Sequence, residues 1–314
     1  MEKLKVGVST CLLGENVRYD GGHKRDHFIC DVLAPFVEFV PVCPERDCGM
    51  PVPREALRLV GEVEKPRLMT NKTNVDKTEM MEHWMTGKLD ELESEELCGY
   101  IFKSKSPSSG MERVKVYNAK GIPVKKGIGV FARGFMERFP QLPVEEEGRL
   151  HDALLRENFI ERIFVYKRWR DMVKEGSKAA FVEFHAAHKY LIMSHNQTAT
   201  SRLGRIVASL NASNLIEVQA DYFDVLMEVL KRKPTIKRHC NVLMHIMGYF
   251  KEELTHDEKE ELLEVIEEFR SGLIPLIVPV TLLNHLVRKY NKTYLKHQVY
   301  LKPHPSELKL RNHV

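Results

Sequence analysis

The first part of the chain alternates short apolar runs with amphipathic segments. Runs rich in Val, Ile and Phe predict strands, and stretches with apolar residues at helical spacing predict helices. The predicted strands are 3–10, 36–42, 57–63, 97–102 and 113–117, and the predicted helices are 23–33, 72–96 and 130–139. Strands that alternate with helices predict an open, mostly parallel α/β sheet.

Beyond residue 147 the pattern becomes helical throughout. Apolar residues recur at helical spacing over 150–175, 177–194, 200–210, 216–231, 235–250, 257–271 and 280–290. Helices joined by short loops predict an all-α bundle. We therefore expect two domains: an α/β domain over residues 1–147 and an all-helical domain over residues 148–314.

Composition narrows the class of protein. The 314 residues include 43% hydrophobic and 29% charged side chains, with a net charge of +4, which is typical of a globular protein. This mild basicity is compatible with an anionic partner but does not require nucleic acid. No apolar run reaches the roughly 20 residues of a membrane span, and the first residues lack a secretory pattern. We expect a cytoplasmic protein whose six cysteines remain reduced.

Three cysteines lie in polar, loop-like sequence. Cys11 ends the first predicted strand, and Cys43 and Cys48 follow the second, with Glu45 between them. Gly49 and two nearby prolines predict an irregular loop there rather than a helix. Loops at the carboxyl ends of parallel strands usually carry the site of an open α/β sheet, so the three thiols are expected to converge.

A loop rich in serine, lysine and glycine follows the strand predicted at 97–102. It reads KSKSPSSG over residues 103–110. Its hydroxyls and backbone N–H groups are suited to holding an anion or a carbonyl group. A solvated turn is the alternative interpretation of the same composition.

Several long strings resemble the YbgA-like two-domain proteins of bacteria and archaea. In the first half they are STCLLGENVRYDGGHKR, PVCPE with GMPVPRE, IFKSKSPSSGMERVKVY and GIGVF; in the second half they are LPVEEEGRLHD, LRENFIERIF and HCNVLMHIMGYF. The first half is also similar to the thiouracil desulfidase family, which holds a [4Fe-4S] cluster through three cysteines. The open iron of that cluster takes sulfur from a thiocarbonyl, and water supplies the oxygen that replaces it.

The resemblance implies a ligand set with one departure. The family has a cysteine where this chain has Ser109. We expect Cys48 to take that place, with Cys11 and Cys43 as the other two cluster ligands. There are two alternatives to this ligand set: the serine at 109 is engineered, or the protein has lost the cluster.

The remaining site residues are expected to serve the substrate and water. Glu45 is the expected general base for water, and Asp20 is a second candidate. Ser106, Ser108 and Ser109 are expected to bound the substrate pocket.

The sequence therefore predicts a [4Fe-4S]-dependent desulfidase that removes sulfur, without redox change, from a thiolated nucleobase or related thioamide. The expected partner is a small thio-compound or a thiolated RNA base. No membrane partner is expected. The alternative is a nucleotide- or RNA-binding regulatory module without turnover. Its support is the positive charge of the helical half, from Arg202, Arg205, Lys231, Arg232, Lys233, Lys237 and Arg238.

Overall fold

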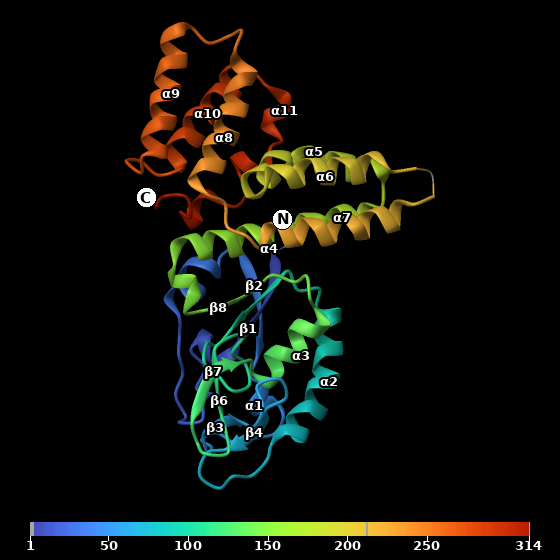
Figure 1. Cartoon of the computed structure of the whole chain (residues 1–314), viewed down its shortest axis with the longest axis vertical. Helices are drawn as coiled ribbons and strands as arrows, with labels where there is room; N and C mark the ends of the chain where they lie inside the picture. Colours follow the sequence, from blue (N-terminus) through green and yellow to red (C-terminus); the bar gives the residue numbers. More distant parts are fainter. Residues whose placement is uncertain (1–2, 212, 314) are drawn as a thin grey trace. The chain divides into compact units, whose positions relative to one another are not determined.

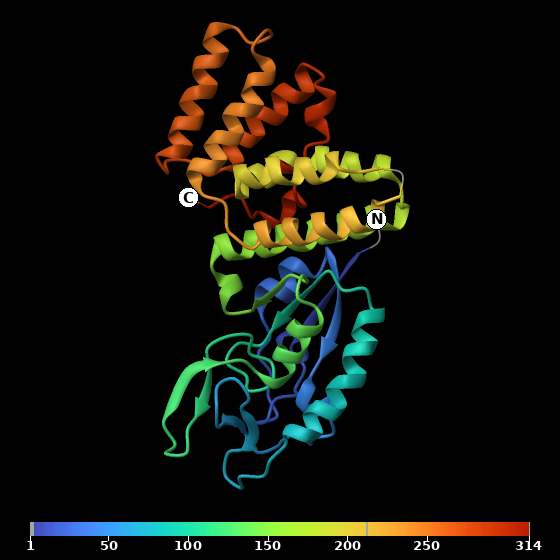
Figure 2. The ribbon, with the colours of Figure 1, turned by 45° about the vertical axis from the view of Figure 1, so that its right-hand side comes forward.

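The computed structural model describes residues 3–211 and 213–313, and its two compact units divide between Asp152 and Ala153. The boundary predicted after residue 147 lies a few residues earlier. Figures 1 and 2 show strands and flanking helices in the first unit and helices in the second. The predicted fold classes, an open α/β domain and an all-helical domain, are confirmed.

The first unit contains a parallel sheet of four strands in the order β2-β1-β5-β8. These strands are β1 (Leu4–Ser9), β2 (Val37–Val42), β5 (Gly99–Phe102) and β8 (Val144–Glu146). All three pairings are parallel, so the carboxyl ends of the four strands lie at one edge. At the centre, a Cβ on Gly7 would lie 2.2 Å from the Tyr100 ring, so only glycine lets that ring pack on β1.

A second four-stranded sheet has the order β4-β3-β6-β7. It contains β3 (Leu57–Val60), β4 (Arg67–Thr70), β6 (Val114–Tyr117) and β7 (Pro123–Gly127). Only the β3–β6 pairing is parallel. The helices of this unit are α1 (Pro44–Asp47), α2 (Thr78–Ser94) and α3 (Val130–Arg138), with the short segments η1 (Thr10–Leu13), η2 (Phe28–Leu33) and η3 (Arg149–His151).

Three local predictions for this unit differ from the structure. The helix predicted at 23–33 is only the short η2, because the turn after Asp20 extends as irregular chain to His27. The helix predicted at 72–96 begins at Thr78, since the preceding residues complete the β4 region through a bridge between Met69 and Asp76. No strand was predicted between residues 117 and 130, where the structure has the hairpin strand β7.

The second unit is helical, as predicted. Its helices are α4 (Ala153–Glu175), α5 (Lys178–His195), α6 (Gln197–Ala208), α7 (Leu215–Leu230), α8 (Ile236–Met247), α9 (His256–Arg270), α10 (Ile277–Lys289) and α11 (Thr293–Lys296), with η4 (Gly248–Phe250), η5 (Val299–Leu301) and η6 (Ser306–Leu308). Ser177 and Thr235 cap the starts of α5 and α8, and Thr255 with Glu258 forms a capping box on α9. Such caps stabilise helix starts by satisfying free backbone N–H groups.

Three histidines in the helical unit are held neutral inside the protein. Burial lowers the pKa of His188 and His239 to about 3 and that of His304 to about 4. Burial also raises the pKa of Glu157 to about 7. Below the ordinary histidine pKa of about 6.5, the unfolded chain therefore binds three protons that the native unit does not, while native Glu157 holds one that the unfolded chain releases.

We predict that this unit loses stability as the pH falls from about 6 to 4.5. With a net excess of two protons on the unfolded chain, the slope is roughly 3 kcal/mol per pH unit. Urea unfolding of the full chain, followed by far-ultraviolet circular dichroism across this range, measures it. His188→Leu should flatten the slope, whereas substitution of the exposed His256 by Gln should not. A slope of zero or of opposite sign would contradict the prediction.

Candidate functional site

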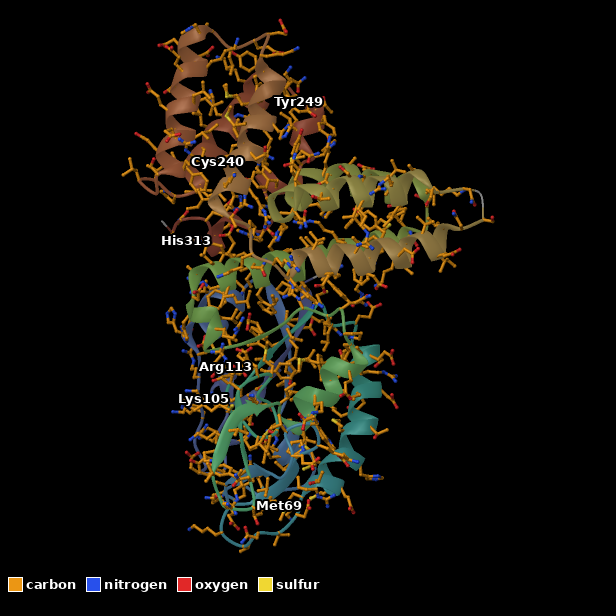
Figure 3. All side chains as sticks on the ribbon, viewed as in Figure 1. Met69, Lys105, Arg113, Cys240, Tyr249 and His313 are labelled. Atoms are coloured by element: carbon orange, nitrogen blue, oxygen red, sulfur yellow. The ribbon has the colours of Figure 1, made fainter. Side chains whose placement is uncertain are left out.

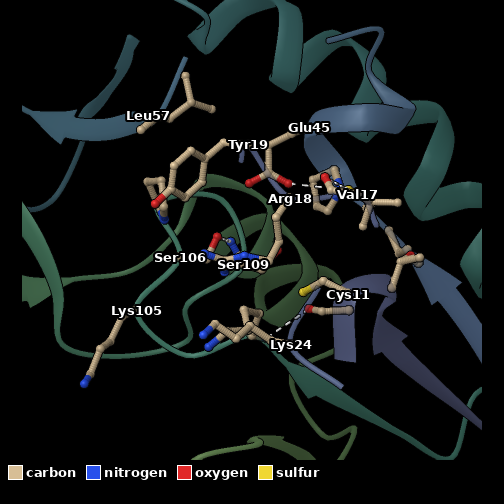
Figure 4. A pocket seen from close by; sticks show the side chains of 18 of the residues that line it. Cys11, Val17, Arg18, Tyr19, Lys24, Glu45, Leu57, Lys105, Ser106 and Ser109 are labelled. Atoms are coloured by element: carbon tan, nitrogen blue, oxygen red, sulfur yellow. Dashed lines mark hydrogen bonds between the residues drawn. The ribbon is translucent and has the colours of Figure 1, made fainter. Parts of the chain in front are cut away.

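A pocket lies where the strands of the parallel sheet end. Its volume is about 430 Å³, and Figure 4 shows most of its lining. The lining residues come from the ends of β1, β2 and β5 and from two neighbouring loops: Ser9, Thr10, Cys11, Val17, Arg18, Tyr19, Lys24, Val42, Cys43, Pro44, Glu45, Arg54, Ala56, Leu57, Lys103, Ser104, Lys105, Ser106, Pro107 and Ser109. The pocket thus occupies the edge where open α/β sheets place their sites.

Two of the predicted ligands, Cys11 and Cys43, line this pocket together. Ser9 lies opposite Val42 in the register of β1 and β2, so the two cysteines follow adjacent strand ends. Burial raises the pKa of Cys11 to about 11, with Lys103 acting in the opposite direction. Burial, reinforced by the charge of Glu45, raises the pKa of Cys43 to about 12. Without a bound metal both side chains are therefore neutral thiols at pH 7.

The third predicted ligand, Cys48, does not line the pocket. Residues Pro44–Asp47 form the helical turn α1, with Cys43 at its start and Cys48 at its end. The Cys48 thiol donates to the Glu45 carbonyl oxygen at 3.3 Å and packs against the apolar cluster around Met50 and Met81. A helical turn, where an irregular loop was predicted, lies between the two cysteines.

Ser109 stands at the pocket instead, in the position where the family has cysteine. Its side chain is 3% exposed and its backbone N–H donates to Ser106 Oγ at 3.1 Å. Among residues 3–211 and 213–313, no group of three or more His, Cys, Asp or Glu side chains is arranged to hold a metal ion. The side chains that the pocket offers to a metal therefore include two thiols, the Glu45 carboxylate and several hydroxyls, among them that of Ser109.

The serine loop has one member behind the pocket wall. Ser106 and Ser109 line the pocket, but Ser108 is fully buried and is not part of the lining. Ser108 Oγ donates to Glu45 Oε1 at 2.5 Å and also lies 2.9 Å from Ser106 Oγ and 3.3 Å from Ser109 Oγ. Ser108 therefore contacts Glu45, which lines the pocket.

The two predicted carboxylates have different surroundings. Glu45 lines the pocket, 3.8 Å from the Cys43 sulfur and 3.8 Å from Arg54 Nη2. Asp20 is exposed and absent from the lining; it accepts from the Gly22 N–H at 3.1 Å and from Arg18 Nε at 3.3 Å. These bonds lower the pKa of Asp20. Asp20 thus pairs with Arg18, which lines the pocket, and of the two carboxylates Glu45 is the one that lines the pocket.

Sequence reasoning missed the positive charge of the pocket. Arg18, Lys24, Arg54 and Lys103 line it. Arg54 is anchored by a hydrogen bond from Nη1 to the Val17 carbonyl at 2.9 Å. Arg18 and Lys24 lie in the RYDGGHKR stretch, and Arg54 ends the PVPR stretch. The strings that carry the family resemblance therefore already contained these residues. Their convergence depends on the tertiary fold and has no signal in local spacing.

A larger groove adjoins the pocket. Its volume is about 880 Å³, and it shares Ala56, Leu57, Ser104, Lys105 and Pro107 with the pocket. Its other basic residues are Arg58, Arg113, Lys115, Lys125 and Arg149. Figure 3 labels Lys105 and Arg113 on one side of this unit. The groove makes the surroundings of the pocket positively charged and open to an extended anion.

Comparison with known proteins follows the division of the chain. Residues 6–147 match the family model for 2-thiouracil desulfurase, and residues 189–305 match that of a protein family of unknown function, DUF1722. Each match covers less than half of the chain, one within the α/β unit and the other within the helical unit. This combination confirms the YbgA-like two-domain architecture predicted from the sequence.

Two individual proteins are similar to parts of the chain. The uncharacterized protein YbgA of Escherichia coli (strain K12) is 28% identical over 153 residues, covering 48% of this chain and 90% of YbgA. A solved structure of the [4Fe-4S]-dependent thiouracil desulfidase TudS is 28% identical, covering 48% of this chain and 95% of TudS, with a TM-score of 0.40. In the described part of the chain no helix is both long and apolar enough to cross a membrane.

Proposed function

We propose that the N-terminal unit removes sulfur from a thiolated nucleobase or related thioamide, replacing C=S by C=O and releasing the sulfur as sulfide. The observation that carries this proposal is the pocket itself. Two thiols, Cys11 and Cys43, and the carboxylate of Glu45 line one cavity at the strand ends. They do so within the residues that match the 2-thiouracil desulfurase family model.

The donors of the pocket fit a [4Fe-4S] cluster at two cysteine positions. Cys11 and Cys43 would hold it, with the Ser109 hydroxyl at the third position. A cluster held in this way supplies an iron with a free coordination site, for which a soft thiocarbonyl sulfur is a suitable ligand. Arg18, Lys24 and Lys103 would offset the negative charge of thiolates in this buried place. The lining supports Ser109 rather than Cys48 as the third neighbour.

Glu45 is the residue proposed to take a proton from the attacking water. Ser108 donates to one of its carboxylate oxygens, Oε1, which fixes the orientation of the carboxylate. The other oxygen, Oε2, lies on the side of Cys43 and Arg54. A carboxylate held in this way is a suitable general base for water next to the substrate carbon. The balance is C=S plus H₂O giving C=O plus H₂S.

The adjoining groove supports a substrate larger than a free base. Lys105, Lys115 and Lys125 have no ion-pair partner among the described residues, and such lysines are suited to phosphate. A thiolated base that carries a phosphate, alone or within RNA, would place its base in the pocket and its phosphate in the groove. The same groove is what favours the alternative, a nucleotide- or RNA-binding module without turnover.

Turnover by anaerobically reconstituted protein decides between the two functions. The protein is supplied with 2-thiouracil and, separately, with 4-thiouridine monophosphate, and sulfide and desulfurated product are measured. We expect sulfide and product in equal amounts, with the phosphorylated compound used at lower concentration because of the groove. Binding without release of sulfide would reject the desulfidase and leave the binding module.

A further inference from the structure

Three consecutive glutamates at the end of β8 are buried. Glu145 and Glu146 are 6% exposed and Glu147 is 8% exposed. Burial of a carboxylate is unfavourable unless hydrogen bonds or an opposite charge compensate for the lost water. The partners of these three side chains therefore indicate what the strand stabilises.

Glu147 holds the start of the serine loop. Its Oε2 accepts from the Ser104 backbone N–H at 2.7 Å, and its Oε1 accepts from Ser104 Oγ at 2.8 Å. The same oxygen pairs with the Lys103 ammonium. Lys103 and Ser104 both line the pocket. One carboxylate thus fixes both the path of the chain as it leaves β5 and the place of a cation in the pocket wall.

Glu146 holds the end of the same loop. Its Oε1 accepts from the Met111 backbone N–H at 2.9 Å. β8 runs parallel to β5, with Glu146 opposite Phe102, so its last residues lie beside the departing loop. Ser106, Ser108 and Ser109 lie between the two anchored ends.

The middle of the loop is held by backbone hydrogen bonds from α3, in addition to the Ser108 side-chain bond to Glu45. The first turn of α3 donates from Val130 N to the Pro107 carbonyl at 3.1 Å and from Ala132 N to the Ser108 carbonyl at 3.0 Å. A Cβ on Gly129 would lie 2.4 Å from the Ser108 carbonyl oxygen, so this approach requires glycine. The two ends of the loop, in contrast, depend on side chains of β8.

Glu145 makes no such contact with the loop. Its Oε1 accepts from Arg149 Nε at 2.6 Å and from the Glu146 N–H at 3.0 Å. It has the same residue type as Glu146 and Glu147, is adjacent to them in the chain and is similarly buried. It is therefore a matched control for them.

We propose that Glu146 and Glu147 are positioning residues of the pocket, which hold the two ends of the 103–111 loop and so set the places of Lys103, Ser106 and Ser109. This inference rests on the proposed function, because it assigns the loop to the desulfuration site. Loss of either carboxylate frees one end of the loop. Loss of Glu147 also frees the Lys103 ammonium.

Hydrogen–deuterium exchange of the full chain tests the proposal without any substrate. Exchange of the peptide covering 103–112 is compared in wild type, Glu146→Ala, Glu147→Ala, Glu147→Gln and Glu145→Ala, together with the thermal midpoint. We expect about tenfold faster loop exchange in Glu146→Ala and Glu147→Ala. Glu147→Gln should largely restore slow exchange, because its amide oxygen still accepts from Ser104. Glu145→Ala should lower the thermal midpoint comparably while loop exchange stays slow.

Two results would overturn the assignment: unchanged loop exchange in both Glu146→Ala and Glu147→Ala, or equal acceleration in Glu145→Ala. Turnover of 2-thiouracil by Glu147→Gln adds a functional measurement. We expect its kcat to fall about tenfold at unchanged loop exchange, since Lys103 has lost its charged partner. If wild type releases no sulfide while the exchange pattern holds, the proposed function fails and the anchoring of the loop stands. If wild type releases sulfide while Glu146→Ala and Glu147→Ala are active and keep slow loop exchange, the proposed function stands and the anchoring of the loop fails.

Discussion

Glu45→Gln is expected to lower the kcat for desulfuration by about 10² to 10⁴, the usual contribution of a general base. The substitution keeps the shape of the side chain and the acceptor for Ser108, but the amide cannot take a proton from water. KM and the iron content should stay close to those of the wild type. Sulfide release from 2-thiouracil under anaerobic conditions measures the effect.

Asp20→Asn is the matched control for this prediction, because the sequence proposed both carboxylates as catalytic. Asp20 is exposed and its contacts are with Arg18 and Gly22. We expect its loss to change kcat by about twofold at most, within the range of ordinary surface substitutions. Equal losses in the two variants, or a larger loss in Asp20→Asn, would remove Glu45 from its role.

Arg311→Met is expected to destabilise the helical unit by about 3–5 kcal/mol, the effect of removing one partner from a buried ion pair. Arg311 is 3% exposed. It lies 3.1 Å from Glu157 and 3.4 Å from Glu161, and donates to the Tyr300 carbonyl at 2.6 Å. It therefore joins the end of the chain to α4 and to the η5 segment.

The second carboxylate of this network has another partner. Burial alone would raise the pKa of Glu161. Its hydrogen bond with His195 at 2.6 Å and the charges of His195 and Arg311 outweigh burial, so the pKa of Glu161 is lowered to about 2. Glu161 therefore stays ionised when Arg311 is removed. Glu157, whose pKa is raised to about 7, takes up a proton more readily, which limits the loss.

Urea unfolding followed by far-ultraviolet circular dichroism measures the Arg311→Met effect. The exposed pair of Arg270 with Glu267 on α9 provides the control, since exposed pairs contribute little. Arg270→Met should leave the unfolding midpoint almost unchanged. Midpoints that shift equally in both variants would show that the buried network has no special contribution.

Local pattern predicted most elements of the fold but not the strands β4, β7 and β8. The runs that became β1, β2 and β5 are apolar and β-branched, and the helices of the second unit carry clear helical periodicity. The β8 strand contains Glu145 and Glu146, and consecutive glutamates usually indicate a solvated segment. Their burial depends on Arg149 and on the Met111 N–H, which lie outside the strand. A signal that depends on tertiary partners is not visible in a local window.

The site was predicted in part for a similar reason. The position of Cys11 and Cys43 follows from the rule that parallel strands end at one edge. Cys48 was assigned by its spacing from Cys43, and Gly49 with the prolines favoured an irregular loop. Pro44 directly after Cys43 is also a signal for the first residue of a helix. Taken in that sense, it predicts the α1 turn, which ends at Cys48.

Ser108 and Asp20 are both absent from the pocket lining, for reasons that residue type alone does not show. A serine in a loop and an aspartate near a turn are both suited to a ligand. Ser108 is buried behind the pocket wall, where its hydroxyl contacts Glu45 rather than the cavity. Asp20 is held by local hydrogen bonding, because its carboxylate accepts from the N–H two residues later. This is a common use of aspartate in turns.

Iron and acid-labile sulfide per chain, with the visible charge-transfer spectrum, test the central claim most directly. The protein is prepared and reconstituted anaerobically as wild type, Cys11→Ala, Cys43→Ala, Cys48→Ala and Ser109→Cys. The account predicts that Cys11→Ala and Cys43→Ala lose the cluster, that Cys48→Ala equals wild type, and that Ser109→Cys holds more iron than wild type, because thiolate is the better ligand. Loss of iron in Cys48→Ala, with iron retained in Cys11→Ala and Cys43→Ala, would contradict the account.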